Sequence, residues 1–550
     1  MCEYLYVGMT SGPLLELMDY ARATKEHWLA SFMFSKYSQH IVQTISERLS
    51  ATDAGYTLLS PALSLEQTRR ANPMAEHEDI RQLRIGLYSD RIFFRVSVTE
   101  EENTRIVVDE AIGAAKNMLA QVVAKIVHQQ TNPCAEAVDT CLKTVESVVY
   151  TECIYRKANR LPLKEMNMAL DERELFAGDR LDESAGSGDE WTLLFDKKKL
   201  CSEYCDWISD SDLHGADIER VAGTEHEGYR KTQASNYYAV IVADGDGVGT
   251  VLGNTSELGE ICDSTVMSIS KGLLIYANRA SLEVLNYDSY AYPVYFGGDD
   301  MECFVPLYSM ENDWSFLRLI QELDEHFDAI ITGKDQEAGN KGVPCCENCT
   351  TSYGINIVYF KYPLNKAIQE AHDLLSQAKE SKYGRACRNS KDDSMKKNTV
   401  HIQLRKHSGQ TSRIRLSKAD IGDGYNAWNA FQEYMELKES ETIVHRIHYR
   451  LMAQKALMLS LVQLESVQKR TERIRAWLEN QQEETPISPD YYEKLANLLI
   501  HLWECRLRCD KTSEEQTAYL NNVDGVFRLG ELMDLHAPQT RKRKKEDGAS

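Results

Sequence analysis

The sequence predicts an α+β fold whose centre is a ferredoxin-like βαββαβ unit. Apolar runs at 292–296 and 301–306 flank the tetrapeptide Gly-Gly-Asp-Asp at 297–300, which is typical of a β-hairpin with a glycine-rich corner. Before them, the continuous apolar run at 237–243 indicates a strand buried on both faces, and residues 257–285 read mostly as a helix. This order of strand, helix and hairpin is the front half of the unit.

The back half of the unit follows between residues 352 and 404. Residues 352–360 alternate as in a strand, and residues 366–380 place their apolar side chains at helical spacing. We expect the short apolar segment 400–404 to be the closing strand. The polar segment 332–351 is expected to be a loop inserted between elements of the unit.

Two acidic corners of this unit predict a metal site. Asp299 and Asp300 are adjacent carboxylates, which repel each other unless a cation holds them together. Asp244 and Asp246 follow the buried strand two residues apart, so both side chains point the same way in extended backbone. We therefore predict that Asp244, Asp299 and Asp300 share one or two Mg²⁺ or Mn²⁺ ions that serve phosphoryl transfer.

Glycines surround both corners and favour the close approach of phosphate to the backbone. They are Gly245, Gly247 and Gly249 at the first corner, and Gly297 and Gly298 at the second. We expect these glycines, together with Asp246, to bind the substrate.

Cysteines and histidines suggest further metal ligands. Cys346 and Cys349 have the spacing of a zinc knuckle, and Cys201 and Cys205 are a candidate partner pair for Zn²⁺. A loop with buried thiols and no zinc explains the pattern as well. His445 and His448 lie three residues apart in a helical segment, and ordinary helix-face histidines are the simpler interpretation.

The composition is that of a multidomain protein without a membrane segment. A chain of 550 residues exceeds a single core, and no apolar run approaches the about 20 residues that a membrane-spanning helix needs. The 14 cysteines are scattered rather than arranged as a small disulfide framework. Since a signal-peptide pattern is also lacking, we expect a cytoplasmic protein.

Several segments are distinctive as a set. They are YYAVIVADGDGVGTVLG from residue 237, YPVYFGGDD from 292, YGINIVYFKYPLNKAIQEAHDLLSQAKESKYG from 353, VHIQLRKHSGQ from 400, GPLLELMDYARATKEHWLASFMFSKYSQHIV from 12, and LYSDRIFFRV from 87. In order and spacing, the first four resemble the palm of the large subunit of type III CRISPR effector complexes. The last two resemble the type III-B (Cmr) version of that subunit, where they belong to a first, degenerate palm.

The resemblance implies an activity and its site. In complexes that hold guide RNA paired to target RNA, such subunits polymerise ATP into cyclic oligoadenylate: a ribose hydroxyl attacks an α-phosphate, and pyrophosphate leaves. By position, Asp244, Asp299 and Asp300 match the metal-binding residues. Lys379 resembles the phosphate-facing lysine of related palm cyclases. The implied partners are ATP, guide RNA, target RNA and the other Cmr subunits of a hetero-oligomer.

One family feature is not expected in this chain. Many relatives carry an N-terminal HD nuclease domain, whereas here the palm-like pattern begins almost at Met1. The one adjacent His-Asp pair of the sequence, His372-Asp373, lies in the palm helix. We therefore expect no HD-type DNase activity and a surface position for this pair.

The net charge of −21 is unusual for a partner of RNA. Contact with RNA is then expected only through local basic patches, of which 388–397 and 541–545 are candidates. A solvated end is the simpler interpretation of the second.

The expected architecture combines two ferredoxin-like palm domains, the first degenerate and the second active, with two mainly helical domains. Its divisions are a degenerate palm at 1–100, a mainly helical domain with a possible zinc insert at 101–235, the active palm at 236–410, a C-terminal helical domain at 411–536, and a basic disordered tail at 537–550.

Three other functions remain open from the sequence. The same palm could transfer AMP to another acceptor such as S-adenosylmethionine, because both reactions need the same metal-held ATP. A catalytically silent scaffold is disfavoured by the intact acidic set, and a free-standing diguanylate cyclase is disfavoured by the domains on both sides of the palm.

Overall fold

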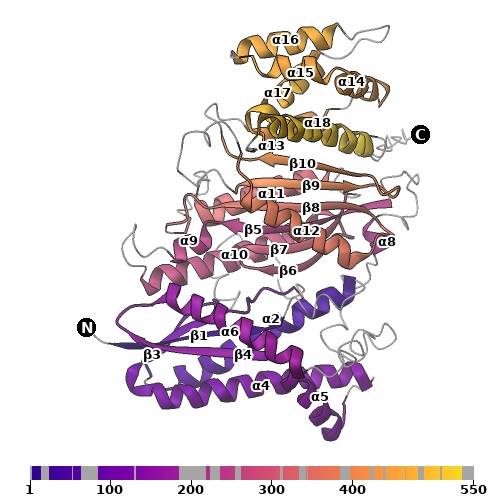
Figure 1. The fold of residues 1–550 in the computed structure, drawn as a ribbon. Coiled ribbons are helices and arrows are strands. Elements are labelled where there is room, and N and C mark those ends of the chain that lie inside the picture. The colour runs from indigo at the N-terminus through magenta and orange to yellow at the C-terminus, as the bar shows by residue number, and fades with distance from the viewer. Residues whose placement is uncertain are drawn as a thin grey trace, which may run out of the picture.

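The computed structural model describes the larger part of the chain. The described residues are 3–13, 24–52, 54–62, 85–128, 132–184, 218–222, 236–253, 262–309, 314–333, 342–343, 345–383, 397–420, 426–437, 441–464, 466–480, 489–507, 509 and 511–534. Figure 1 shows three parts stacked in chain order: an N-terminal sheet with its helices, a second sheet in the middle, and a group of helices at the far end.

The N-terminal part is a complete βαββαβ unit. Its strands lie in the order β2-β3-β1-β4, and each neighbouring pair is antiparallel. α2 and α4 pack on one face of this sheet, and α6 covers the other, around Tyr6. The elements are β1 (Tyr4–Gly12), α2 (Thr24–Ser50), β2 (Thr57–Ser60), β3 (Ile92–Ser97), η3 (Val98–Glu100), α4 (Glu101–His128), α5 (Ala135–Val148), β4 (Tyr150–Ala158) and α6 (Leu163–Ser184), followed by α8 (Ile218–Val221).

The expected division at residue 100 falls inside this unit. β4 closes the sheet by pairing with β1, from Tyr4 opposite Ala158 to Gly12 opposite Tyr150. It therefore comes from the range 101–235, which we expected to be a separate, mainly helical domain. The helical periodicity of α4 and α5 is strong in the sequence and outweighed the single strand behind them. These helices are the crossover between the third and fourth strands.

The middle part is the predicted palm, built on a six-stranded sheet in the order β10-β9-β8-β5-β7-β6. The hairpin β6–β7 forms one edge, and β5 is paired on both sides. The elements are β5 (Tyr237–Asp246), α9 (Val248–Gly253), α10 (Asp263–Tyr287), β6 (Tyr292–Gly297), β7 (Asp300–Pro306), α11 (Phe316–Phe327), η7 (Asp328–Thr332), β8 (Thr350–Tyr359), α12 (Leu364–Glu380), β9 (Thr399–Arg405) and β10 (Thr411–Ser417).

The strand that closes the second βαββαβ unit is β8, and the expectation that 400–404 would close it was wrong. β8 pairs antiparallel with β5, whereas β9 pairs parallel with β8 on its outer side. The second helix of the unit is α11, which the sequence analysis overlooked although its buried residues have helical spacing. α12, β9 and β10 extend the sheet beyond the unit, so the strand pairing also continues past the expected boundary at 411.

One apolar core joins the N-terminal unit to the palm. Residues Ala239 and Ile241 of β5 face the cluster that contains α10 and α11. Their neighbours Val240 and Val242 belong instead to a cluster that includes α12, α2 and the N-terminal sheet, with Val7 among its members. α2 lies between the two sheets in Figure 1. The two units therefore share buried surface and pack against each other through a common core.

The C-terminal part is helical and covers the outer edge of the palm sheet (Figure 1). The side chain of Asn522 accepts from Arg415 N and donates to Arg415 O, both at 2.6 Å, and so satisfies backbone groups on the edge strand β10. The helices are α13 (Ala427–Met435), α14 (Glu441–Ala453), α15 (Lys455–Val462), α16 (Val467–Glu479), α17 (Pro489–Glu504) and α18 (Thr512–Asp534). None of the helices within the described ranges is long and apolar enough to cross a membrane.

His448 ties α14 to α18 through two carboxylates. Its ring nitrogens lie 3.1 Å from Glu531 Oε1 and 3.0 Å from Asp524 Oδ1, and its ring stacks on Phe527. Burial lowers the pKa of His448, but the hydrogen bonds to Asp524 and Glu531 outweigh this and hold the pKa above its usual value.

Substitution of His448 should destabilise the C-terminal part in a pH-dependent way. The charged His448 stabilises the fold fully below pH 6.5, and this stabilisation is lost as the pH rises through the raised pKa of the folded state. We expect His448→Gln to cost about 2 kcal/mol at pH 6 and much less at pH 9. Thermal unfolding at both pH values measures this, and an equal loss at pH 6 and 9 would contradict it.

Candidate active site

The pairing of β5 with β7 sets the two predicted acidic corners side by side. Val242 lies opposite Glu302, and Ala243 lies opposite Met301. Continuing this register by one residue sets Asp244 opposite Asp300, and residues opposite each other on antiparallel strands have neighbouring side chains. Asp244 and Asp300 are 56 residues apart along the chain, and the sheet brings them together.

Gly245 makes room for Asp299 at this point. A β-carbon added to Gly245 would lie 2.7 Å from both the β-carbon and Oδ2 of Asp299. That is closer than non-bonded atoms approach, so a side chain here would displace Asp299. The sequence analysis predicted Gly245 as a phosphate-contacting glycine. The structure gives another reason for a glycine here, because any side chain would clash with Asp299.

The hairpin turn has the geometry that its glycines predict. Gly297 pairs with Asp300, which confirms the hairpin, and Gly298 in the turn has φ +91°. At the other corner Gly247 has φ +88°, which ends β5 before α9 begins at Val248. Gly249 lies within α9 and is not crowded.

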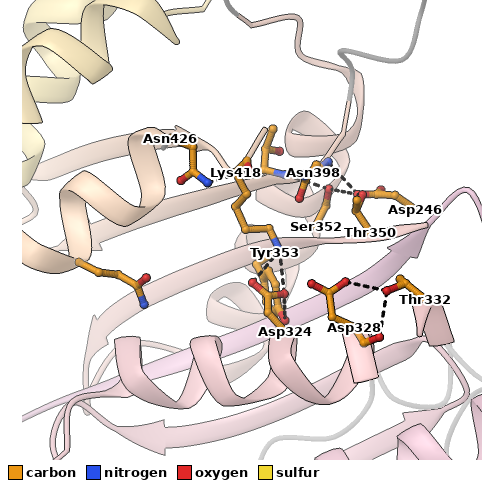
Figure 2. A network of polar contacts seen from close by, with 12 residues as sticks. Asp246, Asp324, Asp328, Thr332, Thr350, Ser352, Tyr353, Asn398, Lys418 and Asn426 are labelled. Atoms are coloured by element: carbon orange, nitrogen blue, oxygen red, sulfur yellow. Dashed lines mark hydrogen bonds and ion pairs between the residues drawn. The ribbon is translucent and has the colours of Figure 1, made fainter. Parts of the chain in front are cut away.

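Asp246 is held by a network that the sequence analysis missed (Figure 2). Its Oδ2 accepts hydrogen bonds from Thr350 Oγ1 at 3.0 Å, Ser352 Oγ at 2.6 Å and the backbone N–H of Asn398 at 2.8 Å. Asn398 has φ +54°, in the left-handed region that asparagine adopts more readily than most residues other than glycine. The alternation of Thr350 and Ser352 on β8 was the available sequence signal.

The second oxygen of Asp246 is buried without a protein partner. The residue is 4% exposed, and Oδ1 accepts no hydrogen bond from the protein. A buried carboxyl oxygen without a donor or cation is costly. This orphaned oxygen points to a cation or a water at the corner, so Asp246 is a candidate cation ligand in addition to the substrate-binding role that the sequence predicts.

Neighbouring carboxylates help to raise the pKa of Asp299 and that of Asp300. Burial and the nearby Asp246 raise the pKa of Asp299 to about 6. The pKa of Asp300 rises to about 8 through desolvation and through the charges of Asp299 and Asp90. The side chain of Asp300 reaches solvent, so repulsion from Asp299 and Asp90 contributes more to its raised pKa than desolvation does. Asp90, which precedes β3 of the N-terminal unit, was not predicted.

Lys379 reaches Asp244 from the last turn of α12 and forms an ion pair with it. Burial, and then the like charge of Lys397, lower the pKa of Lys379 to about 8. The contact with Asp244 favours the charged form, and at neutral pH the ammonium is charged in either case. The predicted phosphate-facing lysine is thus at the acidic corner, where its charge balances Asp244.

The cysteine pair packs beneath the same corner. Cys346 and Cys349 are buried, and their thiols are hydrogen-bonded to each other, which lowers the pKa of Cys349. Sγ of Cys349 lies 3.6 Å from the place of a β-carbon on Gly247. Cys201 and Cys205 lie outside the described residues, so the zinc site stays a prediction.

Both basic segments proposed for RNA contact also stay predictions. Residues 388–396 of the first segment and the whole of the second, 541–545, lie outside the described residues.

A second polar network adjoins the first on the same sheet (Figure 2). Lys418 lies 2.8 Å from Oδ1 of Asp324, and the hydroxyl of Tyr353 donates to the same oxygen at 2.9 Å. The backbone N–H of Lys418 donates to Asn398 O, which links this network to Asp246. Burial raises the pKa of Asp324 despite the lysine. We interpret this pair as the support of the turn that carries Asn398.

The residues present fit a divalent cation in their chemistry. Within the described residues, no three His, Cys, Asp or Glu side chains form a cluster that could hold a metal ion as it stands. The orphaned oxygen of Asp246, the mutual repulsion of Asp299 and Asp300, and the all-oxygen donor set are nevertheless what Mg²⁺ requires. The assignment of Asp244, Asp299 and Asp300 as its ligands stays a prediction.

Comparison with known proteins agrees with this geometry. Residues 237–389 match the second palm domain of Cas10/Cmr2, and residues 6–128 match the N-terminal region of the CRISPR-associated protein Cmr2. Together the two matches cover about half of the chain. The chain belongs to the Cas10/Cmr2 family. The first match contains both acidic corners and Lys379, and the second contains α2 and β3. No curated protein matches the sequence.

Solved structures share the Cas10/Cmr2 fold over nearly the whole chain. A chain of type III-B Cmr-beta bound to cognate target RNA is 11% identical, with a TM-score of 0.56, and the match covers 96% of this chain and 83% of that one. A chain of type III-B Cmr-beta in the apo state is 12% identical, with a TM-score of 0.57, 96% and 82% being covered. At such low identity, the likeness shows a common fold.

Gly245→Ala should damage the acidic corner without unfolding the protein. The added methyl would push Asp299 away, and we expect a stability loss of ~1–3 kcal/mol together with weaker Mg²⁺ binding. Calorimetric titration with MgCl₂ and thermal unfolding measure the two effects. Gly113→Ala on α4 is the control, because nothing lies within 4 Å of its added carbon. Unchanged Mg²⁺ binding in Gly245→Ala would contradict the proposed role of the corner.

Proposed function

We propose that this chain is the large subunit of a type III-B CRISPR effector complex and that its second palm converts ATP into cyclic oligoadenylate when target RNA is bound. The observation that carries the proposal is the convergence of two acidic corners beside a lysine: Asp244 with Lys379, and Asp246 with Asp299 and Asp300. Membership of the Cas10/Cmr2 family supports it.

In this proposal the carboxylates, the glycine turns and Lys379 have separate roles. Asp246, Asp299 and Asp300, joined by Asp244 when Lys379 leaves it, would hold Mg²⁺ or Mn²⁺. The bound ions would neutralise the phosphates and activate the attacking ribose hydroxyl. The turns at Gly247 and Gly298, which carry no side chain, would let the triphosphate approach the backbone.

Lys379 would exchange partners when ATP binds. Its ammonium compensates Asp244 in the structure without ligands. A triphosphate at the corner carries more negative charge than one carboxylate, so it would attract Lys379, while Asp244 would turn to the cation. Before the substrate and its metal bind, the positive charge of Lys379 thus reduces the repulsion between Asp244 and the neighbouring carboxylates.

The proposed partners are ATP, guide RNA, target RNA and the other subunits of a Cmr complex. They are inferred from the family and from the likeness to Cmr-beta bound to cognate target RNA. The net charge of −21 favours a complex in which other subunits hold most of the RNA.

Removing the two hairpin carboxylates tests the proposal. We expect the double variant Asp299→Ala, Asp300→Ala to lose about a thousandfold or more of ATP turnover in the assembled complex, because charge stabilisation at the reacting phosphate is lost. Mass spectrometry of the products made from ATP, with and without target RNA, measures this. Assembly and target-RNA binding should be retained.

A matched control removes two acids elsewhere. Glu136→Ala with Asp139→Ala makes the same change in net charge on the exposed helix α5 and should leave turnover unchanged. Normal turnover in the Asp299, Asp300 variant would refute the proposed chemistry. A product in which AMP is joined to another metabolite, such as S-adenosylmethionine, would keep the site and replace the acceptor.

Lys379→Gln should have opposite effects on metal binding and on turnover. Without its lysine, Asp244 is a free carboxylate, so Mg²⁺ affinity in the absence of nucleotide should rise. Turnover of ATP should fall roughly 10- to 100-fold, because the phosphate loses a cation. Calorimetry with MgCl₂ alone and steady-state kinetics separate the effects, and a parallel fall of both would show that Lys379 only supports the fold.

A further inference from the structure

The N-terminal unit is hydrogen-bonded to the β6–β7 hairpin, which carries Asp299 and Asp300. β6 is the edge strand of the palm sheet, and Tyr295 on it forms an isolated bridge with Gly86 of the N-terminal unit. Ser31 on α2 donates to Val294 O at 2.8 Å, and the N–H of Phe296 donates to Gly86 O at 2.9 Å. These contacts continue the ladder of the edge strand with groups from the other unit.

A buried carboxylate on the second strand of the hairpin is held from both sides. His27 Nε2 on α2 lies 2.6 Å from Glu302 Oε1, and His372 Nε2 on α12 lies 3.1 Å from Glu302 Oε2. The side chains of His27 and Glu302 are each only 4% exposed. His372 lies at the surface, as the sequence predicts, and contacts Glu302 from there.

Glu302 depends on its two histidines for hydrogen-bond partners. One carboxyl oxygen contacts His27 and the other contacts His372, while the side chain is only 4% exposed. A buried polar group is costly to leave without a partner, so β7 cannot shift along α2 without a penalty. The bridge therefore fixes one strand of the hairpin relative to the N-terminal unit.

We propose that His27 is a positioning residue that, through Glu302, sets the place of Asp300 at the active corner. Glu302 follows Asp300 by two residues on the same strand, so both side chains lie on one face of the sheet. A strand is stiff over this length, and chemistry at a metal corner depends on placement to a fraction of an ångström. This inference rests on the proposed function for its effect on catalysis, but its structural part does not.

A comparable pair elsewhere in the palm provides the control. His326 Nε2 lies 3.1 Å from Glu283 Oε2 and joins α11 to α10, and both side chains are largely buried. It makes no contact with the β6–β7 hairpin among the described interactions. Loss of this pair removes a similar polar contact without touching the hairpin.

Hydrogen–deuterium exchange of the full-length protein tests the positioning without any assumption about activity. In His27→Leu we expect backbone amides at 297–305 to exchange roughly tenfold faster than in the unmodified protein, because Glu302 keeps only one partner. His27→Gln should restore slow exchange, since its side-chain amide can donate to Glu302. His326→Leu should leave these amides unchanged. Equal exchange in His27→Leu and the unmodified protein would overturn the inference.

Kinetics in the assembled complex test the consequence for catalysis. His27→Leu should lower kcat for ATP roughly tenfold or more with KM nearly unchanged, because Lys379 and the glycine turns still bind the phosphates. His27→Gln should recover most of kcat, and His326→Leu should not change it. A raised KM at constant kcat would overturn the catalytic role. If the unmodified complex makes no product from ATP, the proposed function fails, whereas the exchange experiment still judges His27.

Discussion

The carboxylates at one end of the palm sheet repel one another, and the other residues of the site offset this repulsion. Asp246, Asp299 and Asp300 meet there, with Asp90 close by: Asp246 raises the pKa of Asp299, and Asp299 and Asp90 raise that of Asp300. The surrounding structure compensates without removing the charge. Three donors bind one oxygen of Asp246, Lys379 neutralises Asp244, and Gly245 leaves space for Asp299. A corner built in this way holds its acids ready for a cation.

The sequence predicts the hairpin and its acids well because the information is local. Glycines at 297 and 298 between apolar runs determine a turn, and Asp299 and Asp300 lie within it. The partners of Asp246 were not predictable in this way. Thr350, Ser352 and Asn398 are ordinary polar residues more than 100 positions away. They acquire a role only when β8 pairs with β5 and β9 pairs with β8. Likewise, His27 and Glu302 are 275 residues apart and meet only in the packed fold.

The boundaries between units were the least predictable part of the fold for a related reason. β4 is a single strand behind two long helices, and its pairing with β1 depends on a sheet edge that local periodicity does not reveal. α11 lies between the hairpin and the loop expected at 332–351, in a stretch for which no element was predicted. In the structure both units have the same order of strands, with the closing strand beside the first. The repeated topology therefore becomes visible only once these two elements are placed.

The apolar cluster that spans both units has a consequence for how such a chain can change in evolution. Val7 of the N-terminal sheet, Trp28 of α2 and Val240 of β5 are buried in one cluster. Exchange of the N-terminal unit for a foreign one would leave cavities or collisions along this seam, each destabilising the fold. Residues on α2 and on the palm strands are thus expected to diverge in matched steps, with a gain of volume on one side balanced by a loss on the other.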